Sequence, residues 1–425
     1  MFSDASVNLV VLPYSYTGTS NEPLSEVGHQ LSVLVHLDTL FSILKYGSIG
    51  AVQIVVRPGA ENESTPDIIL AKLLGEQPGA GSEIRSRHGL VLFWGRIYEE
   101  GDDIYVQSYV RFLRRDVPED LVVQIGGRPF VGRLAAQAFA FSPRKLSRQD
   151  VIEIGRQFAA SATLHSEPKE TAPGRPLVGD QAREEPYGYW VDQLSTDNAW
   201  LHLEPGTGGT GGWINRQQLS GGPLHRKLPE LGFVEALVGY LQLRCGQEAS
   251  TLKPPADTQR WVDEALRLYM EDSSTRQSVR ARLATAVGEQ LTGILRMLNP
   301  NASASNLADA QRSFDAAAAL VPYSADARNL ALLARLSILQ KSGQLKRSGA
   351  ATADDLVAAV ALEPQNDQVL GNLQSLYEAL LPPCCSSESE GTREFRNRLD
   401  AVRKVRSALR PGDKINGAGA SGAPH

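Results

Sequence analysis

Cysteine is scarce in this sequence, where Cys245, Cys384 and Cys385 are the three among 425 residues. Their number excludes a disulfide framework, and their spacing matches no zinc motif. No apolar run approaches the roughly 18 residues that a membrane-spanning helix needs. The N-terminus lacks a basic segment followed by an apolar stretch of signal-peptide length. We therefore expect a protein of a reducing compartment, with the cytoplasm as its location.

An excess of positive charge is also missing. The formal net charge is -5, which argues against a whole-chain role in binding nucleic acid. The content of 42% hydrophobic and 21% charged residues is ordinary for a soluble globular protein. The length is enough for two to four domains. Residue usage that is rich in Arg and Ala and poor in Lys resembles that of a bacterial chain.

The clearest pattern is Leu90–Leu113, which predicts one long β-hairpin. Both halves are rich in aliphatic, β-branched and aromatic residues, and Gly101-Asp102 suits a two-residue type II′ turn. With the turn at this position, one face of the hairpin is apolar and the other is aromatic with polar gaps. Gly95 opposite Ser108 leaves room on the apolar face for a helix to approach. The other expected pairs are Ile97 with Val106, Phe93 with Val110, Val91 with Phe112, Tyr98 with Tyr105, Arg96 with Gln107 and Trp94 with Tyr109.

Strand and helix patterns surround this hairpin in the order β-α-β-α-β-β-β-α. Such an order predicts a mixed sheet with helices packed on it. The predicted strands besides the hairpin are Val7–Leu12, Ala51–Val56 and Asp120–Ile125. Apolar residues from Val27 to Leu44 and from Ile68 to Leu74 predict two helices, and Ser147 is a candidate cap for a third.

The first 160 residues resemble the N-terminal domain family of TolB-like and CsgG-like bacterial proteins. The resemblance rests on the opening strand LVVLPYS, on the helix and apolar strand that follow, and on the hairpin GRIYEEGDDIYVQSYVRF. It implies an α/β domain that often accompanies helical repeats and carries no established catalytic residues. The sequence departs from the family pattern after Arg115, where Gly126-Gly127-Arg128-Pro129 and Ser142-Pro143 interrupt the chain.

Residues 161–222 begin with a linker rich in Pro, Gly and charge and continue with short strand patterns. The sequence W-L-H-L from Trp200, followed by GTGGTGG and Trp213-Ile214, resembles a bacterial SH3-like barrel. The resemblance implies that Trp190, Trp200 and Trp213 fill the interior of a small closed barrel. The first strand is expected within Ala162–Pro168.

From 223 to 410 the periodicity is helical nearly throughout, and two segments are alike. Ser313–Pro322 can be laid over Asp355–Pro364, with Ser324 then matching Asn366. The match resembles tetratricopeptide repeats, although the prolines lie 42 residues apart instead of about 34. The extra residues are expected at Lys341–Ala351. Helices upstream are expected to stack as degenerate repeats, and residues 411–425 to form a disordered tail.

The last predicted helix, Thr392–Arg410, is basic and amphipathic. One interpretation is a surface for an acidic partner, a nucleic acid or a membrane. The other is the polar face of a helix that caps the repeats, and it is slightly favoured. Its basic residues are Arg393, Arg396, Arg398, Arg403, Lys404, Arg406 and Arg410.

Five patterns that resemble chemical sites have simpler interpretations. GTGGTGG lacks the Lys-Ser/Thr of a phosphate-binding loop and reads as a barrel hairpin. His29 and His36, near Asp38, are seven residues apart rather than the four of a chelating pair. The remaining candidates are a cation site at Glu99, Glu100, Asp102 and Asp103, a nucleophile pair of His88 with Cys245, and a metal or redox site at Cys384 and Cys385. We predict no catalytic, cofactor or metal site.

The sequence thus predicts a multidomain α+β protein with an α/β sheet domain, a small SH3-like barrel and TPR-like helical repeats. We expect a non-catalytic adaptor whose repeat groove binds protein partners, with a regulatory role in a bacterial signalling or defence assembly. The residues expected to contact partners are Arg328, Asn329, Asn372, Arg396, Arg403 and Lys404. The alternative is a nucleotide- or ligand-sensing or enzymatic α/β domain, with Thr17, Gly18, Thr19 and Ser20 facing phosphate at the strand ends.

Overall fold

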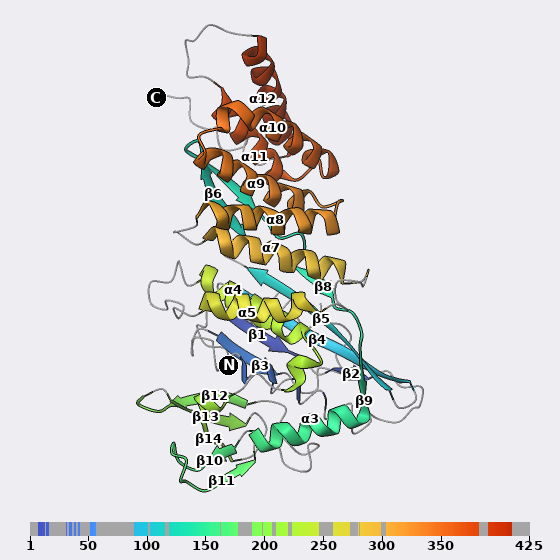
Figure 1. The fold of residues 1–425 in the computed structure, drawn as a ribbon, viewed down its shortest axis with the longest axis vertical. Helices are drawn as coiled ribbons and strands as arrows, with labels where there is room; N and C mark the ends of the chain where they lie inside the picture. The colour runs from blue at the N-terminus through green and yellow to red at the C-terminus, as the bar shows by residue number, and fades with distance from the viewer. Residues whose placement is uncertain are drawn as a thin grey trace, which may run out of the picture. The chain divides into compact units, whose positions relative to one another are not determined.

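A computed structural model divides the chain into two compact units (Figure 1). Unit 1 comprises Met1–Val117 and Gln137–Ala284, and unit 2 comprises Pro118–Ala136 and Thr285–His425. The structure describes single positions between 31 and 42 and residues 7–12, 14–16, 52–56, 89–100, 103–114, 119–161, 163–176, 189–197, 199–205, 210–219, 223–245, 258–272, 279, 281–298, 303–381 and 390–409.

Unit 1 contains a seven-stranded mixed sheet, which confirms the prediction for the N-terminal region. β1 lies between β3 and β4 and runs parallel to both, whereas β4 and β5 are antiparallel. Every residue of β1 is buried, as expected of a strand with neighbours on both sides. The strands are β1 (Val7–Val11), β2 (Ser15–Tyr16), β3 (Val52–Val56), β4 (Gly89–Glu100), β5 (Asp103–Arg114), β8 (Ala138–Ala140) and β9 (Arg144–Ser147).

The predicted hairpin is confirmed, because β4 and β5 pair in the expected register throughout. The rings of Trp94 and Tyr109 stack with their centroids 5.6 Å apart, and those of Tyr98 and Tyr105 stack at 5.1 Å. A slip of one residue would turn these aromatic pairs to the opposite face, so the alternation specifies the pairing. The turn at 101–102 lies outside the described residues.

The space over Gly95 is filled by a tyrosine ring, which corrects the expectation of a helix backbone there. A Cβ atom on Gly95 would lie 2.0 Å from Cε1 of Tyr14, the second residue after Leu12. The Tyr14 hydroxyl is 2.9 Å from Oγ of Ser108. Ser108 in turn donates a hydrogen bond of 3.1 Å to Glu230, the first residue of helix α4 (Glu230–Cys245). The small pair therefore accommodates a ring and a buried carboxylate.

Helix α4 and helix α5 (Thr258–Glu271) belong to unit 1. This corrects the prediction that they begin the repeat domain. Every residue from Glu230 to Gln242 is buried, and α4 contacts β1, β4 and α5. A helix that is apolar on all sides must lie between two layers of structure. Gly232 and Gly239 allow the close approach, since a Cβ on either would meet α5 within 3 Å.

Helix α3 (Arg148–Ser161) starts at Ser147, as predicted. Oγ of Ser147 accepts a hydrogen bond of 3.0 Å from the amide of Asp150, and the Asp150 carboxylate accepts one of 3.0 Å from the amide of Ser147. This reciprocal pair satisfies two amides that a helix start leaves open. The hydrogen bond from the Ser147 backbone lowers the pKa of Asp150 to about 2.

A second, five-stranded sheet of unit 1 covers the segment predicted as an SH3-like barrel. Its strand order is β11-β10-β14-β13-β12, and the glycine-rich segment joins the antiparallel strands β13 and β14 as predicted. The strands are β10 (Thr163–His165), β11 (Gly174–Pro176), β12 (Tyr189–Leu194), β13 (Trp200–Pro205) and β14 (Gly212–Asn215), with short 3-10 helices at Arg216–Gln218 and Pro223–Arg226.

The tryptophans of this sheet do not share one environment. Trp200 is buried, with its ring 5.4 Å from that of His165. Trp213 is only partly buried and contacts the ring of His202, so the prediction that it fills an interior is wrong. The side chain of Trp190 lies outside the described residues. The barrel itself remains a prediction.

Unit 2 contains consecutive helices that lie one after another in Figure 1. Ser324 caps α9 by accepting a hydrogen bond from Ala327, and Asn366 caps α11 by accepting one from Val369, each at 3.2 Å. These matching caps agree with the predicted alignment of the two segments. The helices are α7 (Arg282–Leu298), whose first turn belongs to unit 1, α8 (Ala304–Leu320), α9 (Ala325–Lys341), α10 (Leu345–Leu362), α11 (Asp367–Leu380) and α12 (Glu390–Leu409).

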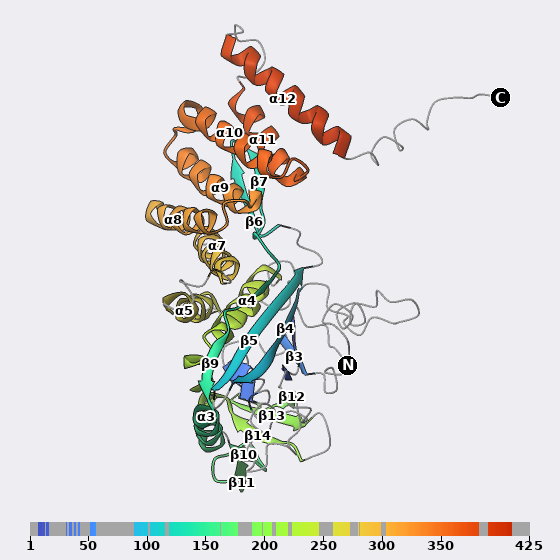
Figure 2. The same ribbon diagram turned by 90° about the vertical axis from the view of Figure 1, so that its right-hand side faces the viewer.

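The strand predicted at Asp120–Ile125 exists as β6 (Leu121–Ile125), but its placement in the N-terminal sheet is wrong. Among the strands of the described residues, it pairs with β7 (Arg128–Gly132) alone, in a separate two-stranded sheet. Gly126 and Gly127 connect the strands with φ angles of 58° and 75°, which a two-residue hairpin turn of type I′ requires. This hairpin packs on α9 and α11, so it belongs to unit 2 (Figure 2).

Candidate partner-binding site

Two asparagines on neighbouring helices of unit 2 hold the main chain of strand β7. Asn372 of α11 accepts a hydrogen bond of 2.9 Å from the amide of Val131 and donates one of 2.7 Å to its carbonyl. Asn329 of α9 donates to the same carbonyl at 2.9 Å. Asn372 also donates to Oδ1 of Asn329 at 2.8 Å, which fixes the two side chains relative to each other. The arrangement recognises an extended backbone without reading a side chain.

These contacts change the interpretation of the predicted groove residues. Asn329 and Asn372 are 0% and 1% exposed. The prediction that they face an external partner is therefore wrong for this structure, because the chain's own hairpin occupies them. Arg328, the next predicted residue, lies on α9 and is partly exposed.

Close packing and further hydrogen bonds hold the hairpin along its length. A Cβ atom on Gly132 would lie 2.4 Å from Cδ2 of Leu330, so only glycine fits without movement. Phe130 is fully buried. The carboxylate of Asp120 accepts a hydrogen bond of 2.7 Å from the amide of Leu134, which closes the end of the hairpin. The hairpin is thus a built-in part of the helical unit.

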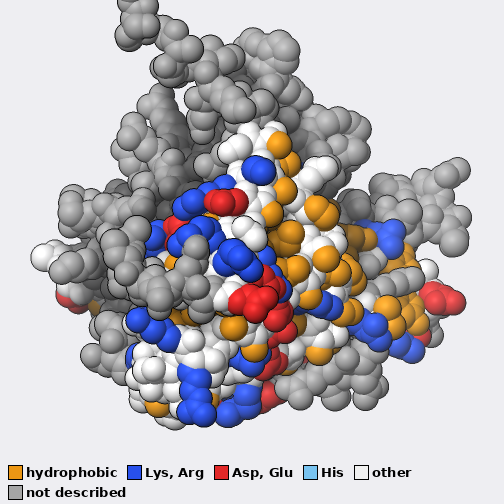
Figure 3. Space-filling view, turned by 90° about the horizontal axis from the view of Figure 1, so that it is seen from above, with side chains coloured by type: hydrophobic (Ala, Val, Ile, Leu, Met, Phe, Trp, Pro, Cys, Tyr) orange, Lys and Arg blue, Asp and Glu red, His pale blue; other side chains and the backbone are white. Residues whose placement is uncertain are grey.

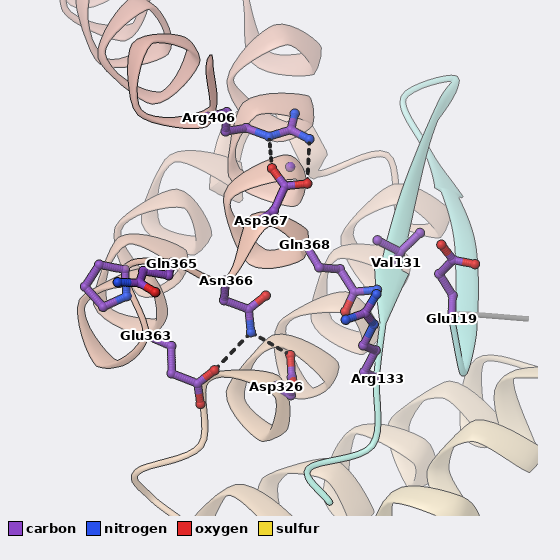
Figure 4. A pocket seen from close by; sticks show the side chains of 12 residues that line it. Glu119, Val131, Arg133, Asp326, Glu363, Gln365, Asn366, Asp367, Gln368 and Arg406 are labelled. Atoms are coloured by element: carbon purple, nitrogen blue, oxygen red, sulfur yellow. Dashed lines mark hydrogen bonds and ion pairs between the residues drawn. The ribbon is translucent and has the colours of Figure 1, made fainter. Parts of the chain in front are cut away.

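A cleft of about 890 Å³ lies beside this hairpin, within unit 2 (Figure 4). The starts of α9 and α11, the connection between α10 and α11, and one residue of α12 form its other walls. Its lining is rich in carboxylates and amides. The lining residues are Glu119, Val131, Arg133, Asp326, Glu363, Pro364, Gln365, Asn366, Asp367, Gln368, Gly371 and Arg406.

Asn366 connects two carboxylates of the cleft. Its amide nitrogen donates to Oδ1 of Asp326 at 3.0 Å and to Oε2 of Glu363 at 3.1 Å. Burial raises the pKa of Asp326, and this hydrogen bond from Asn366 opposes the rise. Across the cleft, Arg406 donates to Asp367 at 2.9 Å and to Gln374 at 2.7 Å. One guanidinium of the lining is therefore already engaged.

Helix α12 packs on α11 through the buried residues Leu399 and Val402. This packing favours the interpretation of the basic helix as a cap. Its predicted contact residues Arg396, Arg403 and Lys404 are all exposed, and Arg403 donates to Glu378 at 2.8 Å. Figure 3, viewed from the α12 end, shows basic and acidic side chains next to each other rather than one positive field.

Unit 1 contains a buried cluster of charges that the sequence did not indicate. Nδ1 of His225 is 2.6 Å from Oδ2 of Asp38, and Nε2 of His225 contacts Glu235. Trp261 donates to the other oxygen of Glu235 at 3.3 Å. Burial opposes protonation of His225, but Glu235 and Asp38 outweigh it and hold the pKa of His225 well above its usual value. No motif signals this cluster, because Asp38 and His225 are 187 residues apart.

A second buried network lies where α4 meets the hairpin of unit 1. Beyond its hydrogen bond from Ser108, Glu230 has Nε of Arg144 at 3.5 Å, and Arg144 also pairs with Asp272. Burial raises the pKa of Glu230, with Arg144 acting against the rise. Burial also raises the pKa of Tyr14 far above its usual value. The network links β5, β9, α4 and the residue after α5.

The other sequence candidates either have structural partners or fall outside the described residues. At the hairpin tip, Glu99 pairs with Arg148 at 2.7 Å and Asp103 with Lys145 at 2.6 Å, so these carboxylates have cationic partners. Asp38, which the sequence placed near His29 and His36, has His225 as a partner. Outside the described residues are His29, His36, His88, Asp102, Cys384, Cys385, the side chain of Cys245, and 17–20.

The described residues contain no group of three or more His, Cys, Asp or Glu side chains that could hold a metal ion. None of the helices in the described ranges is long and apolar enough to cross a membrane. Comparisons with protein-family models, curated proteins and solved structures gave no match to this chain.

Proposed function

We propose that the protein is a non-catalytic adaptor that binds a partner protein through unit 2. The pair Asn329–Asn372 already holds the chain's own hairpin β6–β7. The observation that carries the proposal is therefore the cleft of about 890 Å³ beside this hairpin, whose charged and amide side chains can contact an extended segment of a partner. The tetratricopeptide-like repeats, the SH3-like barrel and the TolB-like domain are modules that present surfaces in this proposal.

The hairpin β6–β7 defines where a partner binds. Because it already satisfies both asparagines, the partner contacts the surface that borders the hairpin rather than the asparagines themselves. The cleft beside Val131 and the exposed positions near it form that surface. Tyr323, between α8 and α9, is 67% exposed, which is unusual for a large aromatic residue.

Photo-crosslinking in the native host extract tests the proposal. A photoreactive amino acid at position 323 of the full-length chain is expected to capture a defined partner. Position 279 in unit 1 is the matched control, since Val279 is 69% exposed. The proposal predicts that the partner crosslinks at 323 and not at 279. Identical products at both positions, or a product at 279 alone, would contradict it.

A further inference from the structure

The cleft beside the hairpin is lined by more acidic than basic side chains. Four carboxylates and two guanidinium groups line it, an excess of negative charge. Arg406 donates a hydrogen bond to Asp367, and the side-chain amide nitrogen of Asn366 donates to both Asp326 and Glu363. Arg133 borders the cleft from the hairpin side, and its charge acts to lower the pKa of Asp326. Carboxylates at the starts of α9 and α11 also suit the helix dipoles, so charge alone does not establish a site.

A second feature of the cleft, separate from its charge, is the buried side-chain amide of Gln368. Its side chain is 9% exposed, and Oε1 has no hydrogen-bond partner among the described residues. It lines the cleft, and Figure 4 shows it extending from α11 toward the hairpin strand. A buried amide oxygen without a donor is unfavourable, because it has lost water and gained nothing in return. The oxygen is satisfied when a ligand brings an N–H group.

The geometry points to a recognition site for an arginine side chain of a partner segment, in the cleft formed by Gln368, Asp326 and Glu363. This inference rests on the proposed adaptor function and names the chemistry of the partner. A guanidinium carries five N–H donors in one plane. It can therefore meet two carboxylates and an amide oxygen together, whereas an ammonium group offers three donors at a single point. The raised pKa of Asp326, caused by burial, agrees with a carboxylate that gains from a cation.

Titration with N-acetyl-arginine amide tests the inference directly on the full-length chain. The methyl groups of Val131, which lines the cleft, report binding by NMR. We expect saturable shifts with the arginine probe, weaker binding of the lysine analogue, and none of the citrulline analogue, which has the same shape without charge. Equal shifts with arginine and citrulline, or shifts that avoid Val131, would overturn the inference.

Two variants separate binding from folding. Gln368→Met removes the hydrogen-bond acceptor at similar side-chain volume. It is expected to keep the fold while lowering the affinity for the arginine probe by about tenfold. Asp326→Asn is expected to lower this affinity by a similar factor. Asp355→Asn is the control, since Asp355 lies on α10 outside the cleft and pairs with Arg335. Unchanged affinity in both cleft variants would contradict the site.

The outcomes also distinguish this inference from the adaptor function. A partner that crosslinks at position 323 while the arginine probe fails to bind would remove the cleft as its site and keep the adaptor. A probe that binds the cleft in a chain without any crosslinked partner would leave an arginine site and overturn the adaptor function.

Discussion

Asn372 holds the main chain of the hairpin β6–β7 through two hydrogen bonds, one with the amide and one with the carbonyl of Val131. Replacing it by alanine removes the partners of the Val131 amide and leaves Asn329 with one contact fewer. We expect Asn372→Ala to lower the free energy of unfolding of unit 2 by about 2 kcal/mol, because the Val131 amide loses its acceptor and the Val131 carbonyl loses one of its two donors. Urea denaturation measures the change.

Asn397→Ala is the matched control, because Asn397 is exposed on α12. It should change the unfolding free energy by less than about 0.5 kcal/mol. Hydrogen exchange gives a second readout, since the Val131 amide should lose protection in Asn372→Ala alone. An Asn372→Ala protein as stable as the control would show that the asparagine pair does not hold the hairpin.

His225 makes the stability of unit 1 depend on pH. Its pKa in the folded protein is raised above the unfolded value of about 6.5. Folding then gains from the protonated imidazole, and the gain is complete below that unfolded value. It is lost as pH rises through the folded pKa. We expect unit 1 to become less stable from neutral to alkaline pH.

Thermal unfolding of the wild type and of His225→Gln across this range tests the prediction. The variant is expected to be less stable at low pH and to lack the wild-type decline attributable to the histidine. Parallel curves for the two proteins would mean that Asp38 and Glu235 do not favour the charged imidazole.

At the level of single residues, the sequence predicted the helix cap Ser147 and missed the buried clusters. Ser147 was identifiable because a cap acts on an amide two or three residues away. The Asp38–His225 contact and the unsatisfied Gln368 depend on which distant elements meet. No local spacing encodes such a meeting.

Among the elements, the hairpin β6–β7 differs most from its prediction. Its five-residue strands are too short to specify which layer they join, and only packing against α9 and α11 places them. The longer hairpin β4–β5 was predictable because twelve residues on each strand alternate between two distinct faces. Helix α4 was assigned to the wrong unit, although it has apolar residues on all sides, which is typical of a helix buried between layers.

Gly132→Ala tests how the smaller hairpin is held. The new methyl group would meet Leu330 at 2.4 Å, so the strand or the leucine must move. We expect a loss of about 1–3 kcal/mol in the stability of unit 2, as is usual for overpacking. Exchange of the β6–β7 amides should accelerate, and exchange of the β4–β5 amides should not.

Gly391→Ala is the control, because nothing lies within 4 Å of the position where its Cβ would be. It should leave exchange in both hairpins unchanged. Faster exchange in β4–β5 on substitution of Gly132 would mean that the small hairpin belongs with the large sheet.

For the whole molecule, the division into units predicts how truncated chains behave. A chain that ends at residue 284 keeps α4 on the sheet and α5 on α4, whereas a chain that ends at 222 loses both helices. We expect the longer fragment to stay folded and soluble, and the shorter one to unfold or aggregate, because the sheet face under α4 becomes exposed. Circular dichroism and size-exclusion chromatography compare them.

The longer fragment lacks the helices α9 and α11, on which the hairpin within residues 118–136 packs. Limited proteolysis should therefore cut within these residues while the described strands and helices from β8 to α5 stay protected. A shorter fragment that folds as well as the longer one would support the boundary expected from the sequence at 222 and contradict the role of α4.

The path of the chain has a consequence for biosynthesis. The backbone leaves unit 1 after Val117, returns at Gln137 and leaves again after Ala284. A ribosome adds about 5–20 residues per second, so Leu121, Ile125 and Phe130 emerge on the order of ten seconds before the helices that shelter them. During that interval the apolar side chains of the hairpin β6–β7 are exposed on the nascent chain, because the helices on which they pack have not yet been made. Such a segment is the kind that chaperones of nascent chains bind.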